Sequence, residues 1–327
     1  MTNNPDVIDG IRRGDRVALA RAITILENRS AGYRSLAQAC YRSRNDAWVI
    51  GITGSPGAGK STLVDQLISS YRADNLRVGV IAVDPSSPYT GGSLLGDRVR
   101  MRSRVGDDGV FVRSMSTRGA LGGVSPATAD VIAAYATFGM DRIILETVGA
   151  GQNEVDVVEH ADTVCVAVPP ASGDDIQMLK AGILEIADIF VVNKMDLDGA
   201  PNMVTRLQEM RQLADPGDWD PPIVETIATG PSGIDALYAA IESHRDWAME
   251  SGASEDRRRA RANAELERVV IEDLRARLEE VIEADDLDAL GERILTGPED
   301  PYSLAAELLD RVTHQSNDKH SEATGEH

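Results

Sequence analysis

The sequence predicts an α/β fold in which a mostly parallel sheet is covered by helices on both faces. Seven short apolar runs, rich in Val and Ile, recur between residues 47 and 228, and helix-like stretches separate them. Strands that are buried on both faces have such nearly continuous apolar runs. In addition, a Gly-rich turn directly follows the first run, and ligands of open α/β sheets bind in loops at the carboxyl ends of strands.

The expected strands lie in seven segments, which are AWVIGITG, RVGVIAV, GVFVRSM, DRIILETVG, TVCVAVPP, DIFVVNK and PPIVETIA. Residues 1–46 precede them and are expected to be helical, because apolar residues recur there at three- and four-residue intervals. The α/β domain is expected over residues 47–247. A helical arm over 248–315 and a disordered polar tail over 316–327 follow. The arm carries an apolar stripe of Leu266, Val270, Leu274, Leu278 and Val281.

Composition excludes several classes of protein. The 327 residues carry a net charge of −20, which disfavours a nucleic-acid partner because phosphate binding needs a basic surface. The two cysteines cannot build a disulfide framework and fit a reducing compartment. The longest apolar runs fall well short of the roughly 20 residues that span a bilayer, and residues 1–10 lack the order of a signal peptide. We therefore expect a soluble, cytoplasmic protein without a membrane association.

The turn after the first strand matches the phosphate-loop (P-loop) pattern at every position. The segment GITGSPGAGKST supplies the nucleotide-binding candidates Gly54, Ser55, Pro56, Gly57, Ala58, Gly59, Lys60, Ser61 and Thr62. Backbone N–H groups at a helix N-terminus cradle phosphates, and a Lys adds a cation for the β- and γ-phosphates. The motif predicts a P-loop NTPase, with Lys60 as a catalytic candidate.

Acidic residues at later strand ends predict a magnesium site. Glu146 ends an apolar strand before a Gly-rich turn, and the Ser61 hydroxyl can ligate Mg²⁺ directly. Asp84 and Asp97 lie in the segment VDPSSPYTGGSLLGDRVRM, whose glycines permit the two arrangements of a nucleotide switch. Gln152 is a candidate for orienting the attacking water. The alternatives are that Glu146 is a hydrogen-bonded strand terminus and that Asp97 caps a helix.

A second motif predicts that the base is guanine. Asn193, Lys194 and Asp196 belong to an N-K-x-D string that follows an apolar strand. The Asp carboxylate can accept from N1–H and N2–H₂ of guanine, and adenine offers no such donor pair. The segment TIATG closes the next strand and suggests a backbone contact to guanine O6 from Ala228, Thr229 or Gly230.

Six segments in order resemble one family closely. They are GITGSPGAGKST, VDPSSPYTGGSLLGDRVRM, STRGALGG, ETVGAGQNEVDV, GDDIQMLKAGILEIAD and NKMD. The chain is identified as a member of the methylmalonyl-CoA mutase-associated GTPases, the MeaB/MMAA/ArgK group. The match covers about residues 15–315.

The resemblance implies a Mg²⁺-dependent GTP hydrolase that acts as a homodimer. It also implies a metallochaperone that gates adenosylcobalamin loading of methylmalonyl-CoA mutase and protects that enzyme, with no cobalamin bound to this chain. By motif, Lys60, Ser61 and Glu146 serve phosphate and metal, and Asp84 and Asp97 form the first switch. The family has a further switch that contacts the mutase. The resemblance assigns Asp174, Asp175 and Lys180 to this switch as coupling residues.

Three other functions are weighed against this one. A nickel-delivery GTPase shares the nucleotide motifs but needs Cys or His ligands, and here the cysteines are isolated and the histidines show no metal-ligand spacing. A transport-system kinase would need an acceptor site and ordinarily an adenine reader, against which Asp196 argues. A GTP-gated scaffold would bind its partner with little turnover.

Overall fold

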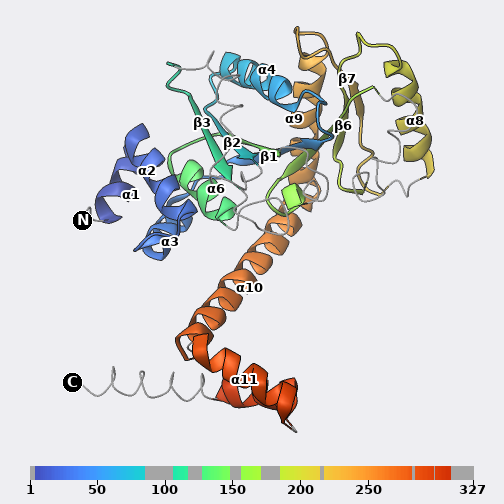
Figure 1. Ribbon diagram of the computed structural model, residues 1–327. Coiled ribbons are helices and arrows are strands. Elements are labelled where there is room, and N and C mark those ends of the chain that lie inside the picture. Colours follow the sequence, from blue (N-terminus) through green and yellow to red (C-terminus); the bar gives the residue numbers. More distant parts are fainter. Residues whose placement is uncertain are drawn as a thin grey trace. The chain divides into compact units, whose positions relative to one another are not determined.

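The fold is built on one seven-stranded sheet (Figure 1). The computed structural model describes residues 4–84, 106–116, 127–147, 156–170, 185–213, 217–281, 284–297 and 299–310. Within these residues the strand order is β3-β2-β4-β1-β5-β6-β7, and every neighbouring pair is parallel. The strands are β1 (Trp48–Gly54), β2 (Val78–Asp84), β3 (Val110–Ser116), β4 (Arg142–Thr147), β5 (Thr163–Val168), β6 (Ile189–Val192) and β7 (Ile223–Glu225). Each of the seven predicted segments contains one strand, so the predicted fold class is confirmed.

Helices precede, connect and follow the strands along the chain. In chain order they are α1 (Asn4–Arg12), α2 (Arg16–Glu27), α3 (Tyr33–Ser43), α4 (Lys60–Ala73), α6 (Thr128–Thr137), the 3₁₀ helix η3 (Asp156–Glu159), α8 (Ala200–Leu213), α9 (Ile234–Glu250), α10 (Ala253–Val281) and α11 (Ala284–Thr296). Residues 301–310 are also helical. Helix α2 begins where the Asp15 carboxylate accepts from the N–H groups of Val17 and Ala18, which is a regular N-cap.

Two hydrophobic cores lie on opposite faces of the sheet, because neighbouring residues of a strand point to opposite sides. In β4, Ile143 and Leu145 belong to the core under α1, α2, α3, α6 and α8. Ile144 belongs to the other core, which α4 and α9 cover. This layering leaves the carboxyl ends of the strands to the loops, and the first of these loops is the P-loop.

Aspartates accept hydrogen bonds at the amino ends of the strands, on the opposite side of the sheet from the P-loop. Three of them directly precede a strand, and each accepts a hydrogen bond from a backbone N–H at the start of the neighbouring strand. The pairs are Asp141 with Arg77 N at 2.7 Å, Asp162 with Val49 N at 2.9 Å and Asp188 with Val164 N at 2.7 Å. These bonds satisfy N–H groups that lie at the ends of the strands.

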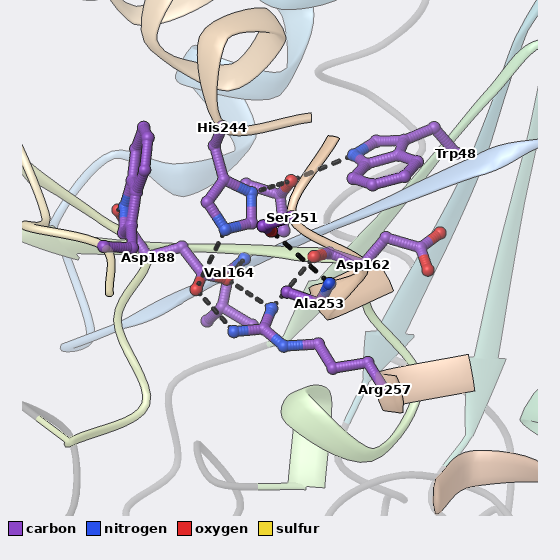
Figure 2. Close-up of polar contacts among 10 residues, drawn as sticks. Trp48, Asp162, Val164, Asp188, His244, Ser251, Ala253 and Arg257 are labelled. Carbon is purple, nitrogen blue, oxygen red and sulfur yellow. Dashed lines mark hydrogen bonds and ion pairs between the residues drawn. The ribbon is translucent and has the colours of Figure 1, made fainter. Parts of the chain in front are cut away.

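Asp188 is also the centre of a buried polar cluster (Figure 2). Its two carboxylate oxygens accept from the Arg257 guanidinium at 2.6 and 2.7 Å. The other side of the cluster is His244, whose Nε2 lies 3.2 Å from Asp188 and whose Nδ1 lies 2.8 Å from the Thr163 hydroxyl. The Trp48 indole N–H donates to the same hydroxyl at 2.9 Å. The cluster thus joins β1, β5, the residue before β6 and α9 to the start of α10.

The electrostatics of this cluster favour the ion pair. Burial opposes ionisation of Asp188, but Arg257 and His244 outweigh it, so the pKa of Asp188 is lowered. The hydrogen bond to Asp188 raises the pKa of Arg257. Both groups are therefore charged at neutral pH.

The chain forms two compact units, Met1–Arg258 and Arg259–His327. Helix α9 continues to Glu250. The expected end of the α/β domain at residue 247 stays a prediction. Arg257 forms an ion pair with Asp188, and Arg258 forms one with Asp162. The first unit therefore includes the start of α10.

Replacing Arg257 by Ala should lower the free energy of unfolding by about 2–4 kcal/mol, because a buried carboxylate loses its main partner. The expected loss of stability is smaller than for a fully buried ion pair, because 36% of the Arg257 side-chain surface stays exposed. Urea unfolding at pH 7 measures the change. The control is Arg275→Ala, which breaks an exposed pair with Glu279 and should cost under about 0.5 kcal/mol.

The pH dependence provides a second check on the same pair. Because the folded pKa of Asp188 is lowered, its contribution to stability is complete above the ordinary value of 3.8 and is lost as pH falls through the folded pKa. Arg257→Ala should reduce this acid-dependent loss. Equal stability of the Arg257 and Arg275 variants at every pH would contradict the assigned role.

Candidate active site

The P-loop connects β1 to α4 at the carboxyl edge of the sheet. Gly59 precedes α4 with φ +87°, a conformation that residues with a Cβ avoid, and no side chain among the described residues caps the helix there. A Cβ at Gly59 would lie 2.4 Å from Asn193 Nδ2. Gly57 also has a positive φ, +77°, but a Cβ there would meet nothing within 4 Å. An uncapped helix N-terminus after a Gly-rich turn is an anion-binding arrangement.

Lys60 is the first residue of α4, and its side chain turns back over the loop. Its ammonium donates to the carbonyl oxygens of Gly54 at 2.6 Å and Ser55 at 3.0 Å. The residue is only 7% exposed. Carbonyl oxygens of the P-loop therefore hold the Lys60 ammonium beside the loop. A β- or γ-phosphate could replace these oxygens as the partner of the ammonium.

Ser61 and Glu146 meet beside this cation. The Ser61 hydroxyl donates to Glu146 Oε1 at 2.6 Å, and both residues are buried. Strand β4 lies between β1 and β2, so Glu146 is opposite Ile52 on one side and Ala82 on the other. A hydroxyl and a carboxylate are hard oxygen donors of the kind that Mg²⁺ prefers, so this pair fits the predicted metal.

Asp84 ends β2, the strand next to β4. Its backbone pairs with Ser116 of β3, two residues beyond the Ala82 that lies opposite Glu146. The structure describes the Asp84 backbone only. The other switch and coupling candidates, Asp97, Gln152, Asp174, Asp175 and Lys180, lie outside the described residues.

Asn193 joins three loops of the site. Its Nδ2 donates to the Ala58 carbonyl in the P-loop at 2.7 Å. Its Oδ1 accepts from the Thr226 hydroxyl at 3.0 Å and from the Ala228 N–H at 3.1 Å. The residue is 1% exposed. These bonds use the amide oxygen fully, so only the remaining Nδ2 hydrogen is available for a base.

The rest of the N-K-x-D string has a different environment. Lys194 adopts φ +61°, which turns the chain away from β6, and the Met195 N–H donates to the Thr226 carbonyl. Asp196 is exposed, and within the described residues its carboxylate makes no hydrogen bond or ion pair. A carboxylate in this condition can accept from a ligand without first losing a protein partner.

The loop after β7 is partly occupied by contacts within the protein. Asn193 holds the Ala228 N–H, and the Gly230 N–H donates to the Ile227 carbonyl. Gln66 of α4 donates to the Ala228 carbonyl at 3.4 Å. Thr229 is exposed. The predicted guanine O6 contact from this loop stays a prediction.

The sequence did not indicate two side-chain contacts in this region. Thr226 fixes Asn193, and the Thr53 and Thr147 hydroxyls bond to each other at the ends of β1 and β4. Their partners are 33 and 94 residues away along the chain, so no local spacing indicated these pairs.

Known proteins with similar sequences support the identification. A family model described as "Methylmalonyl Co-A mutase-associated GTPase MeaB" matches residues 19–283. A putative GTPase of Pyrococcus abyssi is 44% identical over 315 residues, which are 94% of this chain and 96% of that protein. The mitochondrial methylmalonic aciduria type A homolog of Mus musculus is 34% identical over 264 residues, 74% of this chain and 63% of that protein.

A solved structure supports the fold. The crystal structure of a LAO/AO transport system kinase covers 96% of this chain and 99% of its own, with a TM-score of 0.67 and 24% identity. This likeness shows the fold alone.

Fold, P-loop and relatives together define a P-loop GTPase, a protein that binds guanine nucleotide and hydrolyses GTP. Within that class, the chain belongs to the methylmalonyl-CoA mutase-associated GTPase family MeaB. The resemblance seen in the sequence is therefore confirmed.

None of the helices in the described part of the chain has both the length and the apolar character needed to cross a membrane.

The two P-loop glycines provide a matched test of the Asn193 contacts. Gly57→Ala and Gly59→Ala both place a Cβ at positive φ, which costs about 1–2 kcal/mol. Only in Gly59→Ala does the new Cβ also displace the Asn193 side chain. This should lower the free energy of unfolding by a further ~1–3 kcal/mol, because buried polar groups lose their hydrogen-bond partners. Urea unfolding without nucleotide measures both variants. Equal losses would show that Asn193 does not depend on the absence of a side chain at residue 59.

Proposed function

We propose that the Lys60, Ser61 and Glu146 group is the site of Mg²⁺-dependent GTP hydrolysis. The observation that carries this proposal is the 2.6 Å contact between Ser61 and Glu146, beside a Lys60 ammonium that the P-loop holds. In the proposal, Lys60 binds the β- and γ-phosphates, and the backbone N–H groups of the loop surround them.

Ser61 and Glu146 would hold the metal, directly or through its waters. Bound Mg²⁺ supplies positive charge against the charge on the phosphate oxygens. Asp84, at the end of the neighbouring strand, and Asp97 complete the proposed metal environment. Gln152 is proposed to orient the attacking water. The protein's part is to hold these groups in place, because phosphoryl transfer depends mostly on positioning and electrostatics.

The proposed base site consists of Asp196, Lys194 and Asn193. The exposed Asp196 carboxylate accepts from guanine N1–H and N2–H₂, and the Lys194 stem covers one face of the purine. Asn193 has a second role, since its amide holds the P-loop and the loop after β7 together. In the proposal, these contacts would set the separation of the base and phosphate sites.

At the level of the cell, we propose a metallochaperone for methylmalonyl-CoA mutase. The support is the family to which the chain belongs, whose description names that mutase. The GTPase would gate adenosylcobalamin loading and protect the mutase, with Asp174, Asp175 and Lys180 coupling the two proteins. A cytoplasmic location fits the two buried free cysteines, Cys40 and Cys165.

We also propose a homodimer formed through α10. Leu266, Val270 and Leu274 lie four residues apart on this helix and are 65%, 47% and 54% exposed in the single chain. Residues at such spacing share one helix face, so they form an apolar stripe that a second copy could cover.

Guanine specificity is tested by Asp196→Asn. Because Asn loses the charge and one acceptor, GTP affinity should fall about 100-fold. Affinity for xanthosine triphosphate should rise, because the Asn amide can donate to the xanthine oxygen that replaces the guanine amino group. Titrations with fluorescent nucleotides measure both. Comparable binding of ATP and GTP by the unmutated protein would exclude the proposed base site.

The dimer is tested by Leu266→Lys combined with Leu274→Lys. Two charges on the stripe should make the protein monomeric, because burying unpaired ammonium groups is costly. Light scattering should give a molar mass near twice 35.1 kDa for the unmutated chain and near 35.1 kDa for the variant. Val17→Lys is the control, since Val17 is an exposed apolar residue on α2. A variant that remains dimeric would place the interface elsewhere.

The coupling to the mutase is tested by steady-state GTP turnover with and without methylmalonyl-CoA mutase. The mutase should accelerate turnover at least about fivefold, by favouring the hydrolysis-competent state of the GTPase. Lys180→Ala and Asp174→Ala should weaken this acceleration and leave basal turnover within about twofold. Arg206→Ala on α8 is the control. Absence of acceleration would favour the scaffold, and an equal fall in basal turnover would place these residues in the active site.

A further inference from the structure

A pair of buried threonine hydroxyls links the strand before the P-loop to the strand that carries Glu146. The Thr147 hydroxyl donates to the Thr53 hydroxyl at 3.0 Å. Thr53 is 0% and Thr147 2% exposed. Thr53 is the last residue before Gly54, whose carbonyl holds the Lys60 ammonium, and Thr147 directly follows Glu146.

The register of the sheet explains why this pair matters. Backbone pairing between β1 and β4 ends at Ile52 and Glu146. On the other side of β4, pairing with β2 continues to Val83 and Thr147. The hydroxyl bond therefore continues the connection between β1 and β4 one residue past the end of their ladder. Without it, the end of β4 would be held at Thr147 by β2 alone among its neighbouring strands.

The two consecutive residues Glu146 and Thr147 point to opposite faces of the sheet. Glu146 contacts Ser61 on the face that α4 covers, where Ile144 is also buried. Thr147 contacts Thr53 on the other face, where Leu145 is buried. The end of β4 is thus tied to the P-loop segment from both sides, once through each face.

We propose that Thr147 is a positioning residue for GTP hydrolysis, acting through its bond to Thr53. This inference rests on the proposed function, in which Glu146 and Ser61 hold the metal. Thr147 sets where Glu146 lies against Ser61 and where the chain leaves β4. Small displacements of a metal-holding carboxylate change the chemical step more than nucleotide affinity, because the base and phosphate contacts come from other segments.

The test is Thr147→Val, which keeps the β-branched shape and removes the hydroxyl. Single-turnover hydrolysis of prebound GTP should slow about tenfold or more. Equilibrium affinity for a fluorescent GTP analogue should stay within about threefold of the unmutated protein. The Mg²⁺ concentration that gives half-maximal binding of this analogue should rise. Thr147→Ser, which retains the hydroxyl, should restore the rate.

A double-mutant cycle assigns the effect to the pair. Thr53→Val should slow the chemical step similarly, and the double variant should be no slower than either single variant, because both changes remove the same bond. Thr137→Val is the matched control. Thr137 is a buried threonine of α6 whose hydroxyl donates to the Cys40 and Ala133 carbonyls and, within the described residues, to no group of the site. It should lose stability but keep its single-turnover rate.

Glu146→Gln separates this inference from the proposed function. Loss of turnover in Glu146→Gln together with an unmutated rate in Thr147→Val would overturn the positioning role alone. Full turnover in Glu146→Gln would overturn both the proposed metal site and the inference. Additive rate losses in the Thr53 and Thr147 double variant, or no recovery in Thr147→Ser, would also overturn the inference.

Discussion

The nucleotide site depends on one buried amide. Asn193 bonds to Ala58 in the P-loop and to Thr226 and Ala228 at the end of β7, so three segments that are distant in sequence are held at one point. The contact at Ala58 requires a residue without a Cβ at position 59. Because a buried amide left unpaired is costly, these bonds fix the loops relative to each other before any nucleotide arrives. The proposed site is therefore largely preformed on the side where the base is proposed to bind.

Different side-chain contacts stabilise the carboxyl ends and the amino ends of the strands. At the carboxyl edge, side chains of Ser61, Glu146, Thr53 and Thr147 tie the ends of the central strands to the P-loop. At the amino edge, aspartates accept the first N–H groups of neighbouring strands, and Arg257 neutralises one of them. The proposed chemistry lies at the carboxyl ends of the strands, while the ion pair of Arg257 with Asp188 anchors the start of α10 at their amino ends. The parallel strands separate these two sets of contacts, because one lies at their carboxyl ends and the other at their amino ends.

Much of this fold was predictable because its signals are local. Continuous Val and Ile runs indicated all seven strands, and the P-loop pattern identified the loop between β1 and α4. The N-K-x-D string was likewise recognisable, and the exposed Asp196 fits the role predicted for it. Other features were not predictable. The cluster around Asp188, the residue before β6, unites residues from β1, β5, α9 and α10, and no periodicity or motif connects them. The first unit, which extends to Arg258, includes this cluster.

The sequence by itself determined the class of fold, the phosphate loop and the family, because these follow from short-range patterns of apolar residues, glycines and charges. The tertiary structure alone decided which side chains meet. It gave Asn193 a structural role between loops, paired Thr53 with Thr147 across two strands and buried Asp188 beside Arg257. The physical reason is that such contacts join residues 69 to 135 positions apart, and strand register and packing, not spacing along the chain, set their distances.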